Sequence, residues 1–185
     1  AGAHVQALPT GPSFAPGQTD PTIGAVGDDM TVTLNDIRTI INWTSFDIGA
    51  DNSVNFTDAA TTPTAVLNRD LSGNMSQIDG SLLSDSNIVV YLLNTNGITF
   101  GAGANVNVGA LIAGTLGIAD ADFFNGVFAL QDGDASVNFS GSGTAGVTIS
   151  GGTITTTGAA AGLGQLVLLG AFVNAAGGTQ TAGSD

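Results

Sequence analysis

The pattern of apolar and polar positions is most regular in the middle of the chain. An apolar run, Ile88–Leu93, leads into the turn Asn94-Thr-Asn-Gly97, and a second apolar segment, Ile98–Phe100, follows it. Gly97 supplies the positive φ that a tight reversal requires, and the asparagine side chains can bond the backbone around the corner. At Asn105–Val108 Asn and Val alternate, which sends one side chain inward and the next outward. This pattern of apolar runs, turn residues and alternation predicts short β-strands separated by tight corners.

Similar segments recur along most of the chain. An alternating segment lies at 30–34, and a denser apolar one, with the only tryptophan, lies at 37–48. Further strands are predicted at 53–56, 65–67, 77–79, 136–139, 147–150, 153–157 and Leu166–Leu169. Strands this short, with few two-residue hairpins, favour a solenoid of stacked turns, and a sandwich or jelly roll is the alternative. With about 20–22 residues per turn, a solenoid would have roughly six or seven turns.

Two segments depart from this pattern. Residues 1–30 contain four of the five prolines and little periodicity, and we interpret them as an extended leader or cap. Residues 119–126 contain two adjacent phenylalanines and predict a short helical or looped insertion that covers part of the core. The regular domain is therefore expected at 31–185.

Composition excludes several classes of protein. Glu and Lys are absent, so two of the best helix formers are missing and an all-β protein is expected. The net charge of −13, with Arg38 and Arg69 as the only basic side chains besides His4, argues against nucleic acid as a partner. The longest apolar run, Ile88–Leu93, is too short for membrane insertion as a helix. The absence of Cys and the small residues at 1–7 fit an exported chain whose signal peptide has been removed.

Several motifs, read in order, resemble a known family, the N-terminal two-partner-secretion domain of filamentous haemagglutinin and related bacterial adhesins. The resemblance spans about residues 30–175 and rests on the segments 41–49, 53–56, 66–69, 78–80, 92–109, 111–113 and 166–170. Within them lie the turn residues Asn94, Asn96, Gly97 and Ile98 and the cap-motif residues Asn42, Trp43, Phe46, Asn68 and Arg69. The family's turn usually reads Asn-Pro-Asn-Gly-Ile, and here Thr95 replaces the proline, which removes a rigid φ but keeps both asparagines and the glycine.

The resemblance implies a right-handed parallel β-helix with an N-terminal cap. It also implies a Gram-negative-type bacterium, a signal peptide, and export through an outer-membrane β-barrel transporter. The protein would then lie at the cell surface or in the extracellular matrix, where relatives bind host, surface or matrix receptors and glycans. We expect a non-enzymatic protein of this kind.

Candidate chemistry is sparse. Two Asp pairs resemble fragments of calcium loops, namely Asp120 with Asp122 and Asp132 with Asp134, but neither has a complete loop pattern, and solvated turn carboxylates are the alternative. No other cofactor is expected. Some β-helices degrade polysaccharides with Asp, Ca²⁺ and a basic residue, but both arginines here lie in structural motifs. We expect Arg69 to pair with Asp70 or Asp79 or to bond corner carbonyls, and Trp43 and Phe46 to pack in the core rather than stack on sugar.

Self-assembly is a second hypothesis. A solenoid has two ends with unpaired backbone groups, and the sequence after residue 170 is uncharged until its last residue. The leader is expected to be unpaired and able to reach a neighbour. Head-to-tail stacking of copies would then give an open filament, that is, a homopolymer.

Overall fold

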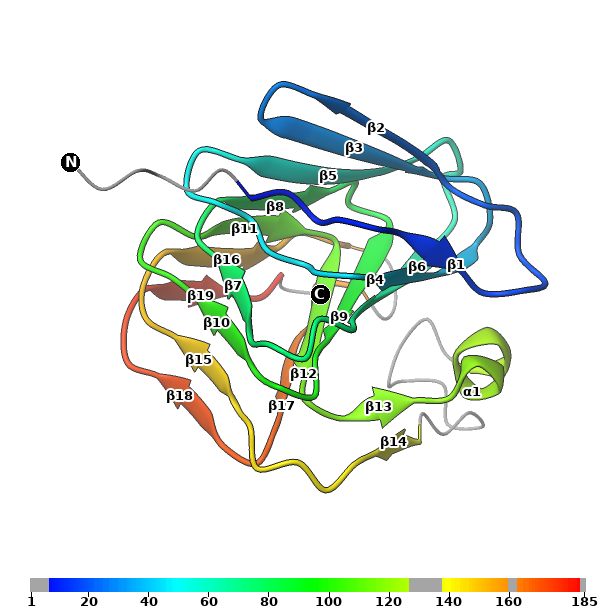
Figure 1. Ribbon diagram of the computed structural model, residues 1–185. Coiled ribbons are helices and arrows are strands. Elements are labelled where there is room, and N and C mark those ends of the chain that lie inside the picture. Colours follow the sequence, from blue (N-terminus) through cyan, green and yellow to red (C-terminus); the bar gives the residue numbers. More distant parts are fainter. Residues whose placement is uncertain (1–6, 127–137, 160–162, 184–185) are drawn as a thin grey trace.

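The computed structural model describes residues 7–126, 138–159 and 163–183, and nearly all of its regular structure is β-strand (Figure 1). The elements are β1 (Ser13–Phe14), β2 (Thr22–Val26), β3 (Asp29–Leu34), β4 (Arg38–Trp43), β5 (Ser53–Asp58), β6 (Thr64–Asp70), β7 (Ser76–Ile78), β8 (Ser81–Ser84), β9 (Ile88–Leu93), β10 (Ile98–Phe100), β11 (Asn105–Val108), β12 (Ala110–Gly114), β13 (Gly117–Ile118), α1 (Asp120–Asn125), β14 (Phe139–Ser140), β15 (Val147–Ile149), β16 (Thr153–Thr156), β17 (Leu166–Leu169), β18 (Val173–Ala175) and β19 (Thr179–Thr181). The expected all-β class is confirmed. Within the described ranges no helix is long and apolar enough to cross a membrane.

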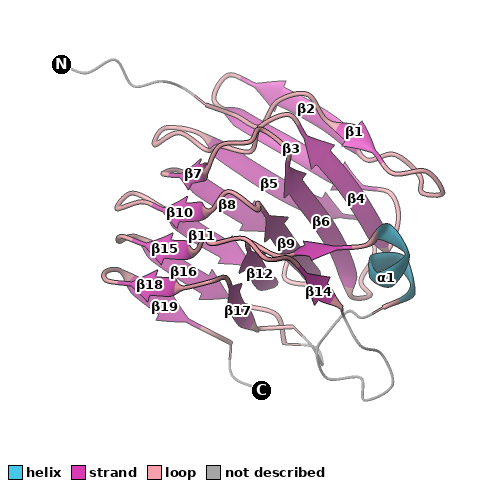
Figure 2. Ribbon diagram, turned by 60° about the horizontal axis from the view of Figure 1, so that its bottom comes forward, coloured by secondary structure: helices cyan, strands magenta, loops and turns pink. Residues whose placement is uncertain are grey.

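Successive strands of the chain belong in turn to three sheets. Sheet I has the strand order β1-β4-β6-β9-β12-β17, sheet II the order β18-β15-β10-β7, and sheet III the order β19-β16-β11-β8-β5-β3-β2. From β5 onward, a strand in sheet III is followed by one in sheet I, then by one in sheet II, and the chain then returns to sheet III beside the first. The first turn, from β3 through β4 to β5, has no strand in sheet II. Figure 2 shows these successive turns lying in layers.

Most neighbouring strands are parallel and in register. In sheet III, Asp29 pairs with Ser53, Ser53 with Ser81, and Ser81 with Asn105. The separations between these partners show that the turns are longer than the sequence pattern predicted. One turn is longer still, because Asn105 pairs next with Thr153. The additional residues include α1 and the antiparallel pair β13–β14, as the insertion at 119–126 predicted.

Sheets I and III are mixed, because the N-terminal strands run the other way, whereas sheet II is parallel throughout. β1 pairs antiparallel with β4, and β2 pairs antiparallel with β3. Leu8, Phe14 and Ile23 from this region pack against the core inside the turns. The expectation of an unpaired leader is therefore wrong for 13–14 and 22–26: these residues bond to the chain's own first turn and cover its end.

Sheet I is buried on both faces. Inside the turns, residues such as Ile41, Val66 and Val90 join the main core. Outside, Leu67, Tyr91 and their neighbours form a second cluster. A strand that is covered on both sides needs a continuous apolar run, and every residue of β9 is apolar or aromatic and buried.

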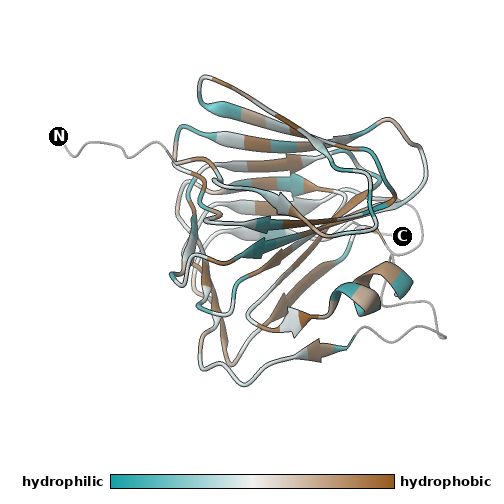
Figure 3. Ribbon diagram, turned by 45° about the vertical axis from the view of Figure 1, so that its right-hand side comes forward, coloured by the Kyte–Doolittle hydropathy of each residue, from teal (hydrophilic) through white to brown (hydrophobic). Residues whose placement is uncertain are grey.

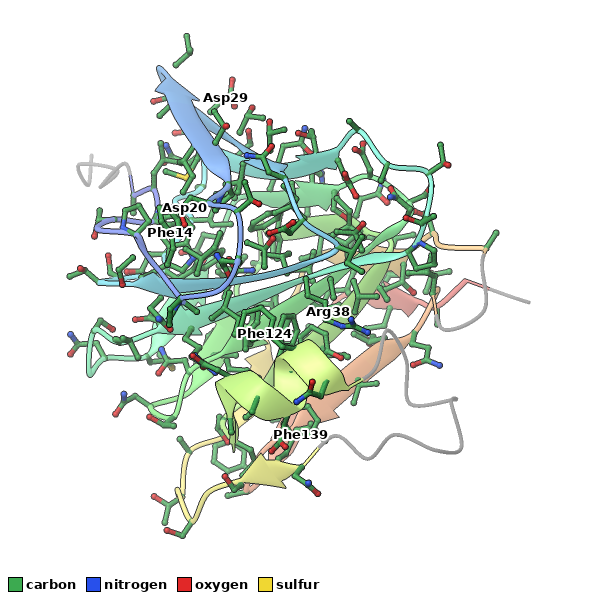
Figure 4. The ribbon with its side chains drawn as sticks, turned by 90° about the vertical axis from the view of Figure 1, so that its right-hand side faces the viewer. Phe14, Asp20, Asp29, Arg38, Phe124 and Phe139 are labelled. Atoms are coloured by element: carbon green, nitrogen blue, oxygen red, sulfur yellow. The ribbon has the colours of Figure 1, made fainter. Side chains whose placement is uncertain are left out.

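The insertion covers the outer face of sheet I. Phe123 of α1 is buried and meets the Tyr91 ring edge-on, with 5.4 Å between ring centroids. Phe124 and Phe139 also pack against this cluster and are labelled on the insertion in Figure 4. Figure 3 shows apolar residues both on the strands and on the helix beside them. We call the described part of the insertion, residues 115–126 and 138–144, the strap.

Candidate functional site

The turn after β9 is closed by the side chain of Asn94. This residue is 1% exposed, although it lies at a corner. Its Nδ2 donates to the Asn74 carbonyl at 2.8 Å and to Ser76 Oγ at 2.9 Å, and its Oδ1 accepts the Asn96 N–H at 2.8 Å. The predicted bond from Asn94 around its own corner therefore forms, and the same side chain also fixes the preceding turn of the chain.

Gly97 completes the reversal. Its φ is +112°, its N–H donates to the Asn94 carbonyl at 3.0 Å, and its own carbonyl accepts the Ser76 N–H. A side chain would be strained at this φ whatever space surrounded it. Ile98 follows as a fully buried residue. Thr95 and the Asn96 side chain are exposed, so the corner closes without the proline that the family motif usually has.

A second buried polar residue, Asp70, supports the same corner one turn earlier. Arg69 pairs with Leu93 in register, so Asp70 occupies the position that Asn94 takes in the next turn. Its carboxylate accepts from the Phe46 N–H at 3.1 Å, the Ser72 N–H at 2.8 Å and the Ser76 hydroxyl at 2.5 Å. Because Ser76 also bonds Asn94, the two corners form one connected buried network.

Sequence reasoning missed Asp70 and Ser76 as parts of this site. The available signal was positional, because Asp70 directly follows a buried strand, as Asn94 does. The separation between Asp70 and Asn94 in the sequence equals the register offset between β6 and β9. Only the register makes the two positions equivalent.

The cap-motif residues divide into a core group and a surface group. Trp43 and Phe46 are fully buried and contact each other edge-on at 5.7 Å, which confirms the prediction of core packing. Trp43 Nε1 donates to Asn68 Oδ1 at 3.0 Å, and Asn68 Nδ2 donates to the Tyr91 carbonyl at 3.1 Å. Asn68 therefore satisfies the indole and links three successive turns.

Arg69 and Asn42 form the surface group. Arg69 donates to Asn42 Oδ1 at 3.3 Å and to the Ile118 carbonyl at 2.7 Å, and it forms an ion pair of 2.7 Å with Asp120. The predicted ion-pair partners Asp70 and Asp79 are wrong, because Arg69 points outward from sheet I toward the strap. The alternative prediction, a bond from Arg69 to a backbone carbonyl, agrees with the bond to Ile118. Arg69 therefore ties the strap to β4 and β6.

The calcium candidates do not form a cluster in the described residues. Asp120 is engaged by Arg69, and Asp122 lies in the first turn of α1, where negative charge is favourable. Asp132 and Asp134 lie outside the described residues. Across 7–126, 138–159 and 163–183, no group of three or more acidic or histidine side chains could hold a metal ion.

Among the described residues, Tyr91 is the titratable group whose pKa is strongly shifted. Burial raises its pKa to about 12, and the Arg38 charge lowers it to a smaller extent. The phenol is therefore neutral at physiological pH, in keeping with a packing role against Phe123.

Comparison with known protein families gives a match over nearly the whole chain. The model of the TPS secretion domain matches residues 14–184. The chain belongs to the TPS secretion domain family. The resemblance inferred from the ordered motifs is therefore confirmed.

Two curated relatives match part of the chain, and both are heme/hemopexin-binding proteins of Haemophilus influenzae. One is 37% identical over 113 residues, which is 61% of this chain and 12% of the relative, and the other is 39% identical over 88 residues, 48% and 9%. The chain thus matches about an eighth or less of the relatives' length. The crystal structure of the HMW1 secretion domain from Haemophilus influenzae superposes with a TM-score of 0.66 at 25% identity, over 87% of this chain and 38% of that one.

Proposed function

We propose that this TPS domain directs a secreted bacterial protein to an outer-membrane β-barrel transporter and then folds outside the cell. The observation that carries the proposal is the family match over residues 14–184. In this proposal the protein has no enzymatic activity. Its partner during export is the transporter, and its destination is the cell surface or the extracellular matrix.

The arrangement of the strands supports folding after transport. Each turn presents a parallel edge to the next, so a chain that emerges in sequence order can add strands one turn at a time. The chain contains no Cys, so no disulfide has to form. We infer that the turns wind as a right-handed parallel β-helix, since crossovers between parallel strands are almost always right-handed.

We further propose a division into a cap, residues 1–30, and a β-helical part, residues 31–185. It is supported by the antiparallel pairing of β1 and β2, both of which precede residue 30. In the β-helical part we assign Asn94 and Gly97 to closing the corner on which the next turn is built. We assign Asn68 and Arg69 to holding neighbouring turns and the strap.

Adhesion is the role we propose after export, with a host, surface or matrix receptor or glycan as the ligand. The names of the heme/hemopexin-binding relatives assign no ligand to this chain, because the matched stretch covers at most 12% of those proteins. The rotating parallel turns provide a scaffold for exposed polar side chains on sheet III, which suits a binding or structural role better than a depolymerase.

A fibre subunit is the second candidate. It is favoured by the last described turn, where β17, β18 and β19 are the outermost strands of their sheets among the described residues and Phe172 and Val173 are 53% and 46% exposed. Light scattering of the purified chain across salt concentrations tests it. Growth of particles with increasing salt would support stacking, and a monodisperse species of 18.2 kDa would exclude it.

The export proposal is tested by deleting the transporter partner in the native host. We expect the protein to disappear from the outside of the cell and to accumulate or be degraded in the periplasm. Gly97→Val should reduce export in the presence of the transporter, and Thr95→Ser is the matched control in the same exposed turn. Unchanged export without the transporter would contradict the proposal.

A further inference from the structure

Among the strands of the described residues, the N-terminal end of sheet III has a free edge. β2 is the outermost strand in the order of this sheet, and its neighbour on the other side is β3. The two strands are joined by a two-residue loop, Gly27 and Asp28, with a φ of +61° at Gly27, as in a type II′ turn. The edge strand, Thr22–Val26, contains neither a charge nor a proline, which are the usual means of blocking an edge.

The register of this hairpin tells which backbone groups face outward along the sheet. Val26 and Asp29 close the two-residue loop and form a hydrogen-bonded pair, so Gly24 also bonds β3. Ile23 and Ala25 alternate with them and direct their N–H and C=O groups to the free edge. An added strand pairs with N–H and C=O groups at every second residue of an edge strand, and Ile23 and Ala25 provide these groups.

A pocket opens beside the same edge. Its volume is about 500 Å³, and its lining combines Ala25, Asp28 and Met30 of the hairpin with the 7–10 segment, Ser45, Asp47 and Asn52. Ala25 pairs with Met30 and therefore shares its inward face. Ile23, two residues earlier, packs against the core, whereas the small side chain of Ala25 leaves space over Met30. A partner residue opposite Ala25 would direct its side chain to this space.

The negative charge of the pocket indicates which side chain an added strand should carry. Among the described residues, the pocket lining contains two aspartates, Asp28 and Asp47, and no basic residue. Asp29 adjoins them on the hairpin, and Figure 4 shows it at the end of the molecule away from Arg38. A strand with a lysine or arginine opposite Ala25 would therefore meet opposite charge in the pocket.

A second copy of this chain does not supply that side chain. The sequence has no lysine, and its two arginines lie on β4 and β6, inside sheet I. The strands at the other end of the molecule, β17, β18 and β19, contain no basic residue. We propose that the free edge of β2 and the adjoining pocket bind an extended strand of another protein, with a lysine or arginine in the pocket.

The proposal concerns the folded 185-residue chain and does not depend on export. The probe is the capped peptide Thr-Val-Thr-Lys-Thr-Val-Thr, and the matched peptide has Glu in place of Lys. We expect the Lys peptide to shift the amide NMR signals of Ile23, Ala25 and Asp28 and to bind about tenfold more tightly than the Glu peptide. Asp47→Asn, which keeps the Oδ1 that accepts the Gln77 N–H, should reduce this preference.

The backbone contact is tested separately. Ala25→Pro removes the N–H on the free edge and should abolish binding, whereas Val26→Thr, on the outward face, should preserve it. A Lys peptide that is N-methylated at every second residue should also fail to bind, and this test leaves the protein unchanged. Equal affinity for both peptides, no binding of the Lys peptide, or signal changes at β17 instead of β2 would overturn the proposal.

Discussion

Sheets I and III are built by the same parallel stacking but differ on their outer faces. On sheet I the outer face carries Leu67, Tyr91 and Ile112, which form one cluster with Phe123 of the strap and with Ala15. On sheet III most outward positions of the parallel strands are Ser, Thr and Asn, with Asp29 and Leu83 as exceptions. In β11, exposed Asn105 and Asn107 alternate with buried Val106 and Val108. The difference shows that the stacking of turns and the covering of the outer face of a sheet contribute separately to the stability of the fold. The inner core and the backbone ladders build the turns, and the strap adds a second core to one side only.

The largest effect is expected from a cavity on the covered face. Leu67→Ala removes a fully buried side chain from the outer cluster of sheet I and should lower the free energy of unfolding by about 2–5 kcal/mol. Asn107→Ala on the exposed face of sheet III should change it by less than about 0.5 kcal/mol. Urea unfolding of both variants measures the contrast. Similar losses in the free energy of unfolding at the two positions would show that the outer face of sheet I is not covered in solution.

Alkaline titration is expected to affect the covered face next. Tyr91 has a pKa of about 12 in the folded chain against 10.0 when exposed. Between these values the unfolded chain ionises and the folded chain does not, so the contribution of Tyr91 to stability is constant below the lower value and falls as the pH rises through this window. The total loss is about 3 kcal/mol.

The sequence makes this titration easy to isolate. The chain has one tyrosine, no cysteine and no lysine, so Tyr91 is the side chain that titrates in this alkaline range. Urea unfolding below, within and at the top of the window should show the decrease in the wild-type chain and a flat profile in Tyr91→Phe. The same decrease in Tyr91→Phe would assign it to another cause.

The smallest effect is expected at the tie between the strap and sheet I. Asp120→Asn removes the ion pair with Arg69, and Asp120 is 46% exposed, so the loss should be at most about 1 kcal/mol and should disappear in high salt. Arg69→Met also removes the bond to the Ile118 carbonyl and should cost more. Thermal unfolding at low and high salt distinguishes the two variants. An Asp120→Asn effect that is independent of salt would contradict this assignment.

The sequence predicted the strands better than it predicted what covers them. The continuous apolar run of β9 and the alternation of β11 each follow from the number of buried faces, so both strands were found at their observed bounds. The partner of Arg69 was missed, because Asp120 is distant in the sequence and its position depends on how the strap folds over sheet I. Asp70 was missed for a related reason: its equivalence to Asn94 exists only in the register between β6 and β9.

The central claim is that the Asn-x-Asn-Gly turn acts in export by building a buried corner. The direct measurement compares the exported fraction of Asn94→Ala with that of Asn96→Ala in the same host. Asn94 is buried and its side chain makes three hydrogen bonds of 2.8–2.9 Å. The Asn96 side chain is exposed and makes one longer bond, from its Nδ2 to Asn94 Oδ1 at 3.4 Å, and the Asn96→Ala variant keeps the backbone N–H. We predict that Asn94→Ala lowers export severalfold and that Asn96→Ala is exported like the wild type. Equal loss in both variants, or a larger loss for Asn96→Ala, would contradict the claim and indicate that the transporter reads the turn as a linear sequence.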